Sequence, residues 1–203
     1  MSSTFTISPT QLHGQKMTAK DYLAMERANI REKNGKYELF NKTLRFMAGA
    51  SEAHNTIATN LVTILNMFLW QQERNTHVYQ SDMKVVSFLT YKNYLYPDIV
   101  VVDETPVYHD IKKDVLINPT LIIEVLSDET EAFDRGDKFV SYRQIESLRE
   151  YILVSQYERR IEHFYKSAEG IWQVGNVIKS GELPLLTLPL SLPVNRVYRQ
   201  LAV

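Results

Sequence analysis

Tyr-Pro-Asp-Ile-Val-Val-Val at residues 96–102 and Pro-Thr-Leu-Ile-Ile-Glu-Val-Leu-Ser at residues 119–127 are two hydrophobic runs that each contain one acid. An unbroken row of β-branched and aliphatic residues, opened by a proline that suits the start of a strand, predicts a strand covered on both faces. Asp98 and Glu124 lie inside these runs. An ionised carboxylate in an apolar interior is unfavourable by several kcal/mol unless it is paired, protonated or bound to a metal. Each of the two acids therefore needs a compensating partner.

The two acids allow two interpretations. If the strands are neighbours, the carboxylates of Asp98 and Glu124 converge, and two oxygen donors with open positions suit a hard divalent cation such as Mg²⁺ or Mn²⁺. Alternatively, each acid accepts backbone hydrogen bonds at a strand end or pairs with one of the 23 Lys and Arg residues. Because both acids occur on hydrophobic strands, we favour one shared functional site over two separate structural roles.

The order of the sequence blocks resembles a known family. Pro97-Asp98, followed 26 residues after the aspartate by Glu124, resembles the PD-(D/E)xK motif of the restriction-endonuclease-like superfamily. Together with Asp-Arg-Gly-Asp-Lys at residues 134–138 and Glu-Tyr-Ile-Leu-Val at residues 150–154, these blocks resemble the Uma-two family over residues 17–190. The resemblance implies a restriction-endonuclease-like fold and metal-dependent hydrolysis of DNA. In that chemistry Asp98 and Glu124 bind Mg²⁺ (or Mn²⁺), with the backbone carbonyl of Val125 as a further ligand.

The sequence departs from the superfamily motif at the lysine. The lysine belongs two residues after the glutamate, where this chain has Leu126. Members of the superfamily can supply the lysine from a neighbouring helix, and Lys138, on the next expected helix, is the candidate. The alternative is that Lys138 forms a solvent-exposed ion pair with Asp134 four residues earlier, which contributes about 0.3–0.5 kcal/mol.

His54 lies in the first turn of a long expected helix that begins after Ser51 as N-cap. The apolar residues of this helix form one stripe: Ile57, Leu61, Ile64, Leu65 and Phe68. At about 100° per residue His54 falls on the centre of that stripe and points inward. It is either a buried neutral histidine or, as the family block suggests, a site residue. Glu52 lies nearly opposite and is the second choice for an additional acid.

Composition limits the class of protein. The chain has 203 residues, no cysteine and a formal net charge of −1, so thiolate chemistry is excluded and no overall positive field attracts nucleic acid. No run approaches the 18 apolar residues of a membrane span, and the N-terminus lacks the features of a signal peptide. We expect a cytoplasmic protein without a membrane segment.

The remaining sequence predicts a single α/β domain at residues 17–203, preceded by a flexible arm at residues 1–16. We expect a mixed central sheet around the Asp98 and Glu124 strands, flanked by helices and extended by C-terminal β-hairpins. Residues 77–86 alternate as one strand, whose polar face allows Gln80 or Lys84 to touch a ligand. The elements expected around it are a helix from Thr18, a hairpin at residues 37–47, a loop at 103–118, a helix from about 128 to 145, and strands at 150–154, 160–166 and 171–175.

The leucine-rich tail at residues 183–194 is interrupted by three prolines, so it cannot form a central strand or a long helix. Its leucines either cover the protein's own sheet or form the interface of a homodimer, which we favour because a nuclease that cuts both DNA strands benefits from two sites.

The leading function is a metal-dependent endonuclease with Lys138 and His54 completing the site. Leu126 and the neutral charge support the alternative, a non-catalytic binding or assembly module. A third possibility is hydrolysis of RNA or a small phosphoester.

Overall fold

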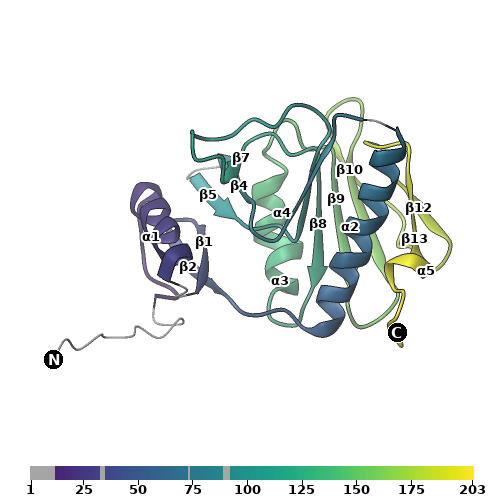
Figure 1. The fold of residues 1–203 in the computed structure, drawn as a ribbon, viewed down its shortest axis with the longest axis horizontal. Helices are drawn as coiled ribbons and strands as arrows, with labels where there is room; N and C mark the ends of the chain where they lie inside the picture. Colours follow the sequence, from purple (N-terminus) through teal and green to yellow (C-terminus); the bar gives the residue numbers. More distant parts are fainter. Residues whose placement is uncertain (1–11, 33–34, 73, 89–91) are drawn as a thin grey trace.

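The computed structural model describes residues 12–32, 35–72, 74–88 and 92–203. It has a mixed α/β architecture with two main sheets and a small two-stranded one (Figure 1). The strands of the central sheet, in spatial order, are β11 (Trp172–Val174), β10 (Ile161–Lys166), β9 (Glu150–Ser155), β8 (Leu121–Leu126), β6 (Ile99–Val102) and β3 (His77–Gln80). Those of the second sheet are β2 (Thr43–Met47), β1 (Lys36–Phe40), β5 (Lys92–Leu95), β4 (Lys84–Phe88) and β7 (Val115–Leu116). The third sheet pairs β12 (Glu182–Pro184) with β13 (Ser191–Pro193). The helices are α1 (Ala19–Glu32), α2 (Glu52–Gln72), α3 (Glu131–Phe133), the π-helix η1 (Asp134–Lys138), α4 (Phe139–Tyr142) and α5 (Val194–Val197).

The two hydrophobic runs form adjacent strands at the centre of the main sheet, as the sequence predicted. Strand β6 pairs antiparallel with β8, and Ile99 lies opposite Ile123. Extending this register by one residue places Asp98, just before β6, opposite Glu124. Opposed residues of an antiparallel pair project from the same face, about 4.5–5.5 Å apart at their Cα atoms. Strand β9 lies parallel to β8 on its other side, and the hairpin strands β10 and β11 extend the sheet as expected.

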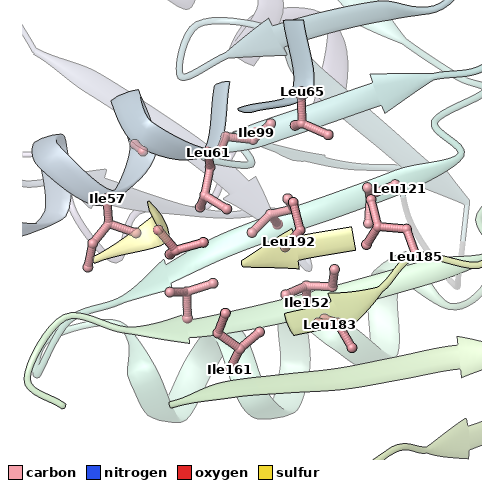
Figure 2. Packing of buried hydrophobic residues seen from close by; sticks show 14 of the residues in the cluster. Ile57, Leu61, Leu65, Ile99, Leu121, Ile152, Ile161, Leu183, Leu185 and Leu192 are labelled. Carbon is pink, nitrogen blue, oxygen red and sulfur yellow. The ribbon is translucent and has the colours of Figure 1, made fainter. Parts of the chain in front are cut away.

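Each face of the central sheet is covered by different elements. Helix α2 packs one face through the predicted stripe, with Ile57, Leu61 and Leu65 buried against sheet residues such as Ile99 and Ile152 (Figure 2). The opposite face buries Leu126 and Leu153 against Phe133 and Tyr142 of the α3–η1–α4 segment. The helix predicted for residues 128–145 is therefore present, but shorter and with a π-helical middle. Because the sheet lies between two layers, its central strands are hydrophobic on both faces.

The C-terminal tail folds back over its own sheet, the alternative to the dimer interface. Leu183, Leu185 and Leu192 are buried in the same core as α2, close to Leu121 and Ile152 (Figure 2), and Leu188 belongs to the same core. The short β12–β13 pair holds them there, with Leu183 opposite Leu192. Leu186 stays exposed, but the other leucines that motivated a dimer through this tail are buried or partly buried against their own sheet.

The second sheet has its own core against α1. Helix α1 begins after Thr18, whose Oγ1 accepts a hydrogen bond from the Asp21 backbone N–H (3.2 Å), as expected for an N-cap. Its buried residues Tyr22 and Leu23 pack with Tyr37 and Tyr94 of the sheet. This layer brings β1 beside the first residues of the Pro-Asp run, because the backbone N–H of Tyr96 donates to Glu38.

One prediction about the strands is wrong. The strand expected at residues 77–86 is divided into β3 and β4, which belong to different sheets, because Ser81 between them has φ 54°, a left-handed conformation that ends an extended strand. The described end of the expected flexible arm contacts β2: Gly14 N–H donates to Leu44 O (2.8 Å), and Lys16 forms a bridge with Thr43. Residues 1–11 of that arm lie outside the described residues.

Across the described chain, no helix combines the length and apolar character that a membrane crossing requires.

Candidate active site

Asp98 and Glu124 meet at the end of strands β6 and β8, in a cleft of about 680 Å³. The backbone N–H of Asp98 donates to Glu124 Oε2 (3.1 Å), and Asp98 Oδ2 accepts a hydrogen bond from the Val125 backbone N–H (2.7 Å). Glu124 is buried, whereas the side chain of Asp98 keeps 19% of its surface exposed. The two acids therefore lie together with one of them open to the cleft.

Lys138 reaches this pair from the helical segment on the same face of the sheet. Its Nζ lies 2.9 Å from Glu124 Oε1 and 3.3 Å from both Glu38 Oε1 and Asp134 Oδ1. It also donates to the backbone carbonyl of Tyr96 (3.4 Å). Lys138 is only 5% exposed, so its interpretation as a solvent-exposed partner of Asp134 is wrong. Leu126, which occupies the motif position of the lysine, is buried in the core.

A π-helix places Lys138 against the sheet. Residues 134–138 form this wider helix between two α-helical turns, and both Asp134 and Lys138 are buried in it. A π-helical turn adds one residue to the helix repeat, is rare, and is frequent at functional sites. Gly136 lies in the middle, with open space where a Cβ would be. The extra residue changes which side chains face the sheet relative to an ordinary α-helix.

His54 also lies at the site. Its Nε2 is 3.2 Å from Asp98 Oδ1. The predicted N-cap fixes the first turn of α2, because Ser51 Oγ accepts the His54 backbone N–H (3.0 Å) and is itself hydrogen-bonded to Gln156. Burial opposes the charged form of His54, but the hydrogen bond and negative charge of Asp98 outweigh it, so the pKa of His54 is raised.

The structure separates the other sequence candidates from the cleft. Glu52, the second choice for an extra acid, is exposed at the first residue of α2 and does not line the cleft. Gln80 is exposed, and Lys84 is fully buried with its Nζ 3.3 Å from Asp114; neither lines the cleft. Val125 does line it, with its backbone N–H bonded to Asp98, and its carbonyl as a metal ligand stays a prediction.

Sequence reasoning missed Glu38 as a member of the site and considered Asp134 only as an exposed ion-pair partner. Glu38, on β1, is buried and accepts the Tyr96 backbone N–H (2.8 Å) in addition to its contact with Lys138. The signal was the one used for Asp98 and Glu124, an acid inside an apolar run, here Tyr-Glu-Leu-Phe at residues 37–40. Tyr142 was missed too; its OH donates to Glu124 Oε1 (3.3 Å).

Negative charge is in excess around Lys138. Three carboxylates, from Glu38, Glu124 and Asp134, lie within 3.3 Å of its Nζ, and Asp98 is adjacent to Glu124. Burial, together with the charges of Asp134 and Asp98, raises the pKa of Glu124 well above its usual range, although Lys138 opposes this. Burial opposes the charge of Lys138, but the surrounding carboxylates outweigh it and raise the pKa of Lys138. Asp134 Oδ1, buried beside this lysine, has no hydrogen-bond donor in suitable geometry among the described residues.

The chain resembles proteins in one family. The Uma2 family, described as "Putative restriction endonuclease", matches residues 19–197. Two proteins of Synechocystis sp. (strain PCC 6803) are similar: "Uncharacterized protein sll1609" is 34% identical over 77% of this chain and 84% of its own length, and "Uncharacterized protein slr1290" is 32% identical over 92% and 94%. The crystal structure of "a putative nuclease belonging to DUF820" from Anabaena variabilis superimposes with a TM-score of 0.67 at 13% identity, covering 81% of this chain and 90% of that one. This structural likeness confirms the expected fold class.

Proposed function

This chain belongs to the Uma2 family, and we propose that it is a metal-dependent nuclease that hydrolyses phosphodiester bonds of DNA. The observation that carries the proposal is the excess of carboxylates around Lys138, next to an open cleft. A purely structural site would balance its buried charges, because an uncompensated buried carboxylate destabilises the fold. A cluster that holds more acids than cations is instead suited to a further cation that arrives from solution.

The donor set fits Mg²⁺ or Mn²⁺. Mg²⁺ typically binds through one or two protein carboxylates and completes its coordination with water and substrate phosphate oxygens. Asp98 and Glu124 would hold it, with the Val125 carbonyl as the predicted third ligand. Within the described chain, no group of three or more His, Asp or Glu side chains is arranged to hold a metal ion, so a site built wholly from protein side chains has no support. A bound divalent ion supplies charge neutralisation at the phosphate and lowers the pKa of a coordinated water.

The chain's own residues would neutralise charge on the substrate phosphate and hold one another in position. Lys138, held at Glu124 by its 2.9 Å ion pair, would offer an N–H donor from Nζ to the negative charge that develops on the phosphate oxygens. Glu38 and Asp134 fix this ammonium in place from β1 and η1. His54 would orient Asp98 through its Oδ1 contact.

A cleavage assay tests the proposal. Purified protein would be incubated with double-stranded DNA, single-stranded DNA and RNA in Mg²⁺ or Mn²⁺, and products would be resolved on gels. We expect DNA cleavage that falls at least about 100-fold in Asp98→Asn and Glu124→Gln. Glu158→Gln, at a half-exposed acid away from the cleft, is the matched control and should cut normally. DNA bound but never cut by wild-type protein would favour the non-catalytic module. Cleavage of RNA alone would show that the substrate is RNA and not DNA.

We also propose a homodimer, because cutting both strands of a duplex is served by two sites related by a twofold axis. Since the tail leucines other than Leu186 pack in or against their own core, the interface would lie on another surface. Light scattering at micromolar concentration would test this, and a monomeric mass would reject it.

A further inference from the structure

Arg45 lies on the wall of the cleft that holds the acids. It is on β2, directly opposite Glu38 in the β1–β2 pair, so both side chains project from the same face. Arg45 lines the same cleft as Asp98 and Glu124 and is partly exposed. Glu38 points from this face to Lys138, which places Arg45 on the strand next to the acid cluster and nearer the solvent.

The guanidinium of Arg45 is held by an aromatic platform. Its central carbon lies 3.7 Å from the centroid of the Phe133 ring, a stacking contact between β2 and α3, and both residues line the cleft. Phe133 is buried and is fixed in turn by Phe40, whose ring packs edge-on at 5.2 Å and 84°. Phe133 directly precedes Asp134 of the acid cluster. Stacking holds one face of the guanidinium and leaves its N–H edge available.

Arg45 differs from the two lysines of the cleft in its charge partners. Lys36 Nζ is 2.8 Å from Asp82, and Lys138 is surrounded by three carboxylates. Three Lys or Arg residues line the described part of the cleft: Lys36, Arg45 and Lys138. Both lysines form ion pairs, whereas Arg45 forms none with a described carboxylate. A planar guanidinium that is pre-oriented, without such a partner and beside a site for phosphodiester chemistry suits an anion with two acceptor oxygens.

We propose that Arg45 binds a phosphate of the DNA backbone as the duplex enters the cleft. This inference rests on the proposed function, because it takes the substrate of that same site. The contact would be to a phosphate, since the rigid fork of guanidinium donors matches the spacing of two phosphate oxygens. Arg45 would therefore contribute to affinity for any DNA sequence and not to sequence preference.

The competing explanation is that the Arg45–Phe133 stack only ties the β1–β2 hairpin to α3. Binding of fluorescent duplexes, measured by anisotropy across a series of salt concentrations with Ca²⁺ in place of Mg²⁺, separates the two explanations. Ca²⁺ can take the place of Mg²⁺ in this binding measurement because it is also a hard ion that prefers oxygen ligands. Three variants would be compared with wild type: Arg45→Gln, Arg45→Lys and, as the matched control, Arg196→Gln, at an exposed arginine outside the cleft.

We expect Arg45→Gln to weaken binding about 10-fold on unrelated duplexes alike. The slope of log K against log salt should fall by about 0.9, the value for one lost phosphate contact. Arg45→Lys should keep the wild-type slope with intermediate affinity, because it retains the charge but loses the planar fork. Arg196→Gln should match the wild type.

Three results would overturn the inference. One is wild-type affinity and salt slope in Arg45→Gln. Another is weaker binding by Arg45→Gln with an unchanged slope and a lowered melting temperature, which would make the stack structural. The third is a wild-type protein that binds no duplex. Failure to cleave bound DNA would instead remove the proposed hydrolysis and leave the Arg45 contact intact, so the two proposals fail separately.

Discussion

Glu124 and Glu150 are both buried acids on adjacent strands, yet their surroundings are opposite. Glu150 lies at the other end of the β8–β9 pair, where Leu121 is its neighbour, and is fully buried. It is ringed by donors: His163 Nε2 at 2.8 Å, the backbone N–H groups of residues 186 and 187 at 2.9 and 2.7 Å, and the Thr187 hydroxyl. Glu124 also accepts hydrogen bonds from the Asp98 backbone N–H and the Tyr142 hydroxyl, but it shares its cation, Lys138, with the acids Glu38 and Asp134. The buried negative charge is therefore compensated at the Glu150 end of the sheet, which we call the balanced end. It is not fully compensated at the Glu124 end, which we call the unbalanced end.

The pKa values of the two acids follow from these surroundings. Burial alone would raise the pKa of Glu150, but His163, Leu186 and Thr187 outweigh it and lower the pKa. Burial raises the pKa of Glu124, and the neighbouring acids Asp134 and Asp98 add to that effect. Burial of an acid is therefore not by itself a sign of function. The informative sign is a buried acid whose neighbours leave negative charge uncompensated.

Removing the lysine should have the largest effect. Lys138→Met would leave Glu38, Glu124 and Asp134 buried without their cation, and we expect a loss of about 3–5 kcal/mol in the free energy of unfolding at neutral pH. Urea denaturation would measure it. Adding Glu124→Gln to this variant should restore part of the loss, because one of the stranded charges is removed. A lysine variant as stable as wild type would show that the acids do not depend on Lys138.

The balanced end of the sheet should be sensitive to loss of its acid. Glu150→Gln replaces an acceptor oxygen by an amide that faces donors of residue 187, and we expect a loss of about 3 kcal/mol. The lowered pKa also fixes a pH dependence. Glu150 contributes stability above its unfolded pKa of about 4.3, and this contribution is lost as pH falls through the lower folded pKa. The gap between wild type and Glu150→Gln should therefore close on acidification; a gap that widens would contradict this sign.

Only the unbalanced end should respond to a divalent ion. Mn²⁺ at 100 times its dissociation constant should stabilise the wild type by about 2.7 kcal/mol, seen as a rise in melting temperature. Asp98→Asn should lose most of this rise, whereas Glu150→Gln should keep it. An equal rise in wild type and Asp98→Asn would place the ion elsewhere.

The smallest expected effect is the stability change in Glu124→Gln. This substitution removes one of the excess charges, so we expect the free energy of unfolding to stay within about 1 kcal/mol of wild type, even though hydrolysis is lost. Comparing it with Glu150→Gln by urea denaturation gives a matched pair with the same chemical change. If Glu124→Gln destabilises as much as Glu150→Gln, the contrast between the two ends fails.

Much of the central fold could be predicted from local sequence. The hydrophobic runs identified β6 and β8 and their two acids, because strands buried on both faces leave a continuous apolar pattern. The stripe of α2 likewise placed His54 on its inner face. Glu38 carried the same signal but was read only as part of a hairpin. Its place in the site depends on how the second sheet meets the first.

Other features had no local signal. The division of β3 from β4 depends on a left-handed Ser81, a conformation that serine seldom adopts. Burial of Lys138 depends on the π-helix, which a repeat of 100° per residue does not anticipate. The tail leucines were recognised as needing a partner, but sequence could not decide between their own sheet and a second chain.

The carboxylates around Lys138 come from distant parts of the chain, and this has a consequence for synthesis on the ribosome. Glu38 and Lys138 are 100 residues apart, which at about 5–20 residues per second corresponds to about 5–20 s of elongation. Until Lys138 emerges, the acids have no cation, and β8 lacks its neighbour β9 and the leucines that cover the sheet. The site can therefore assemble only after Lys138, β9 and these leucines have been synthesised, so a chain that stops before them would present its acids without the geometry described above.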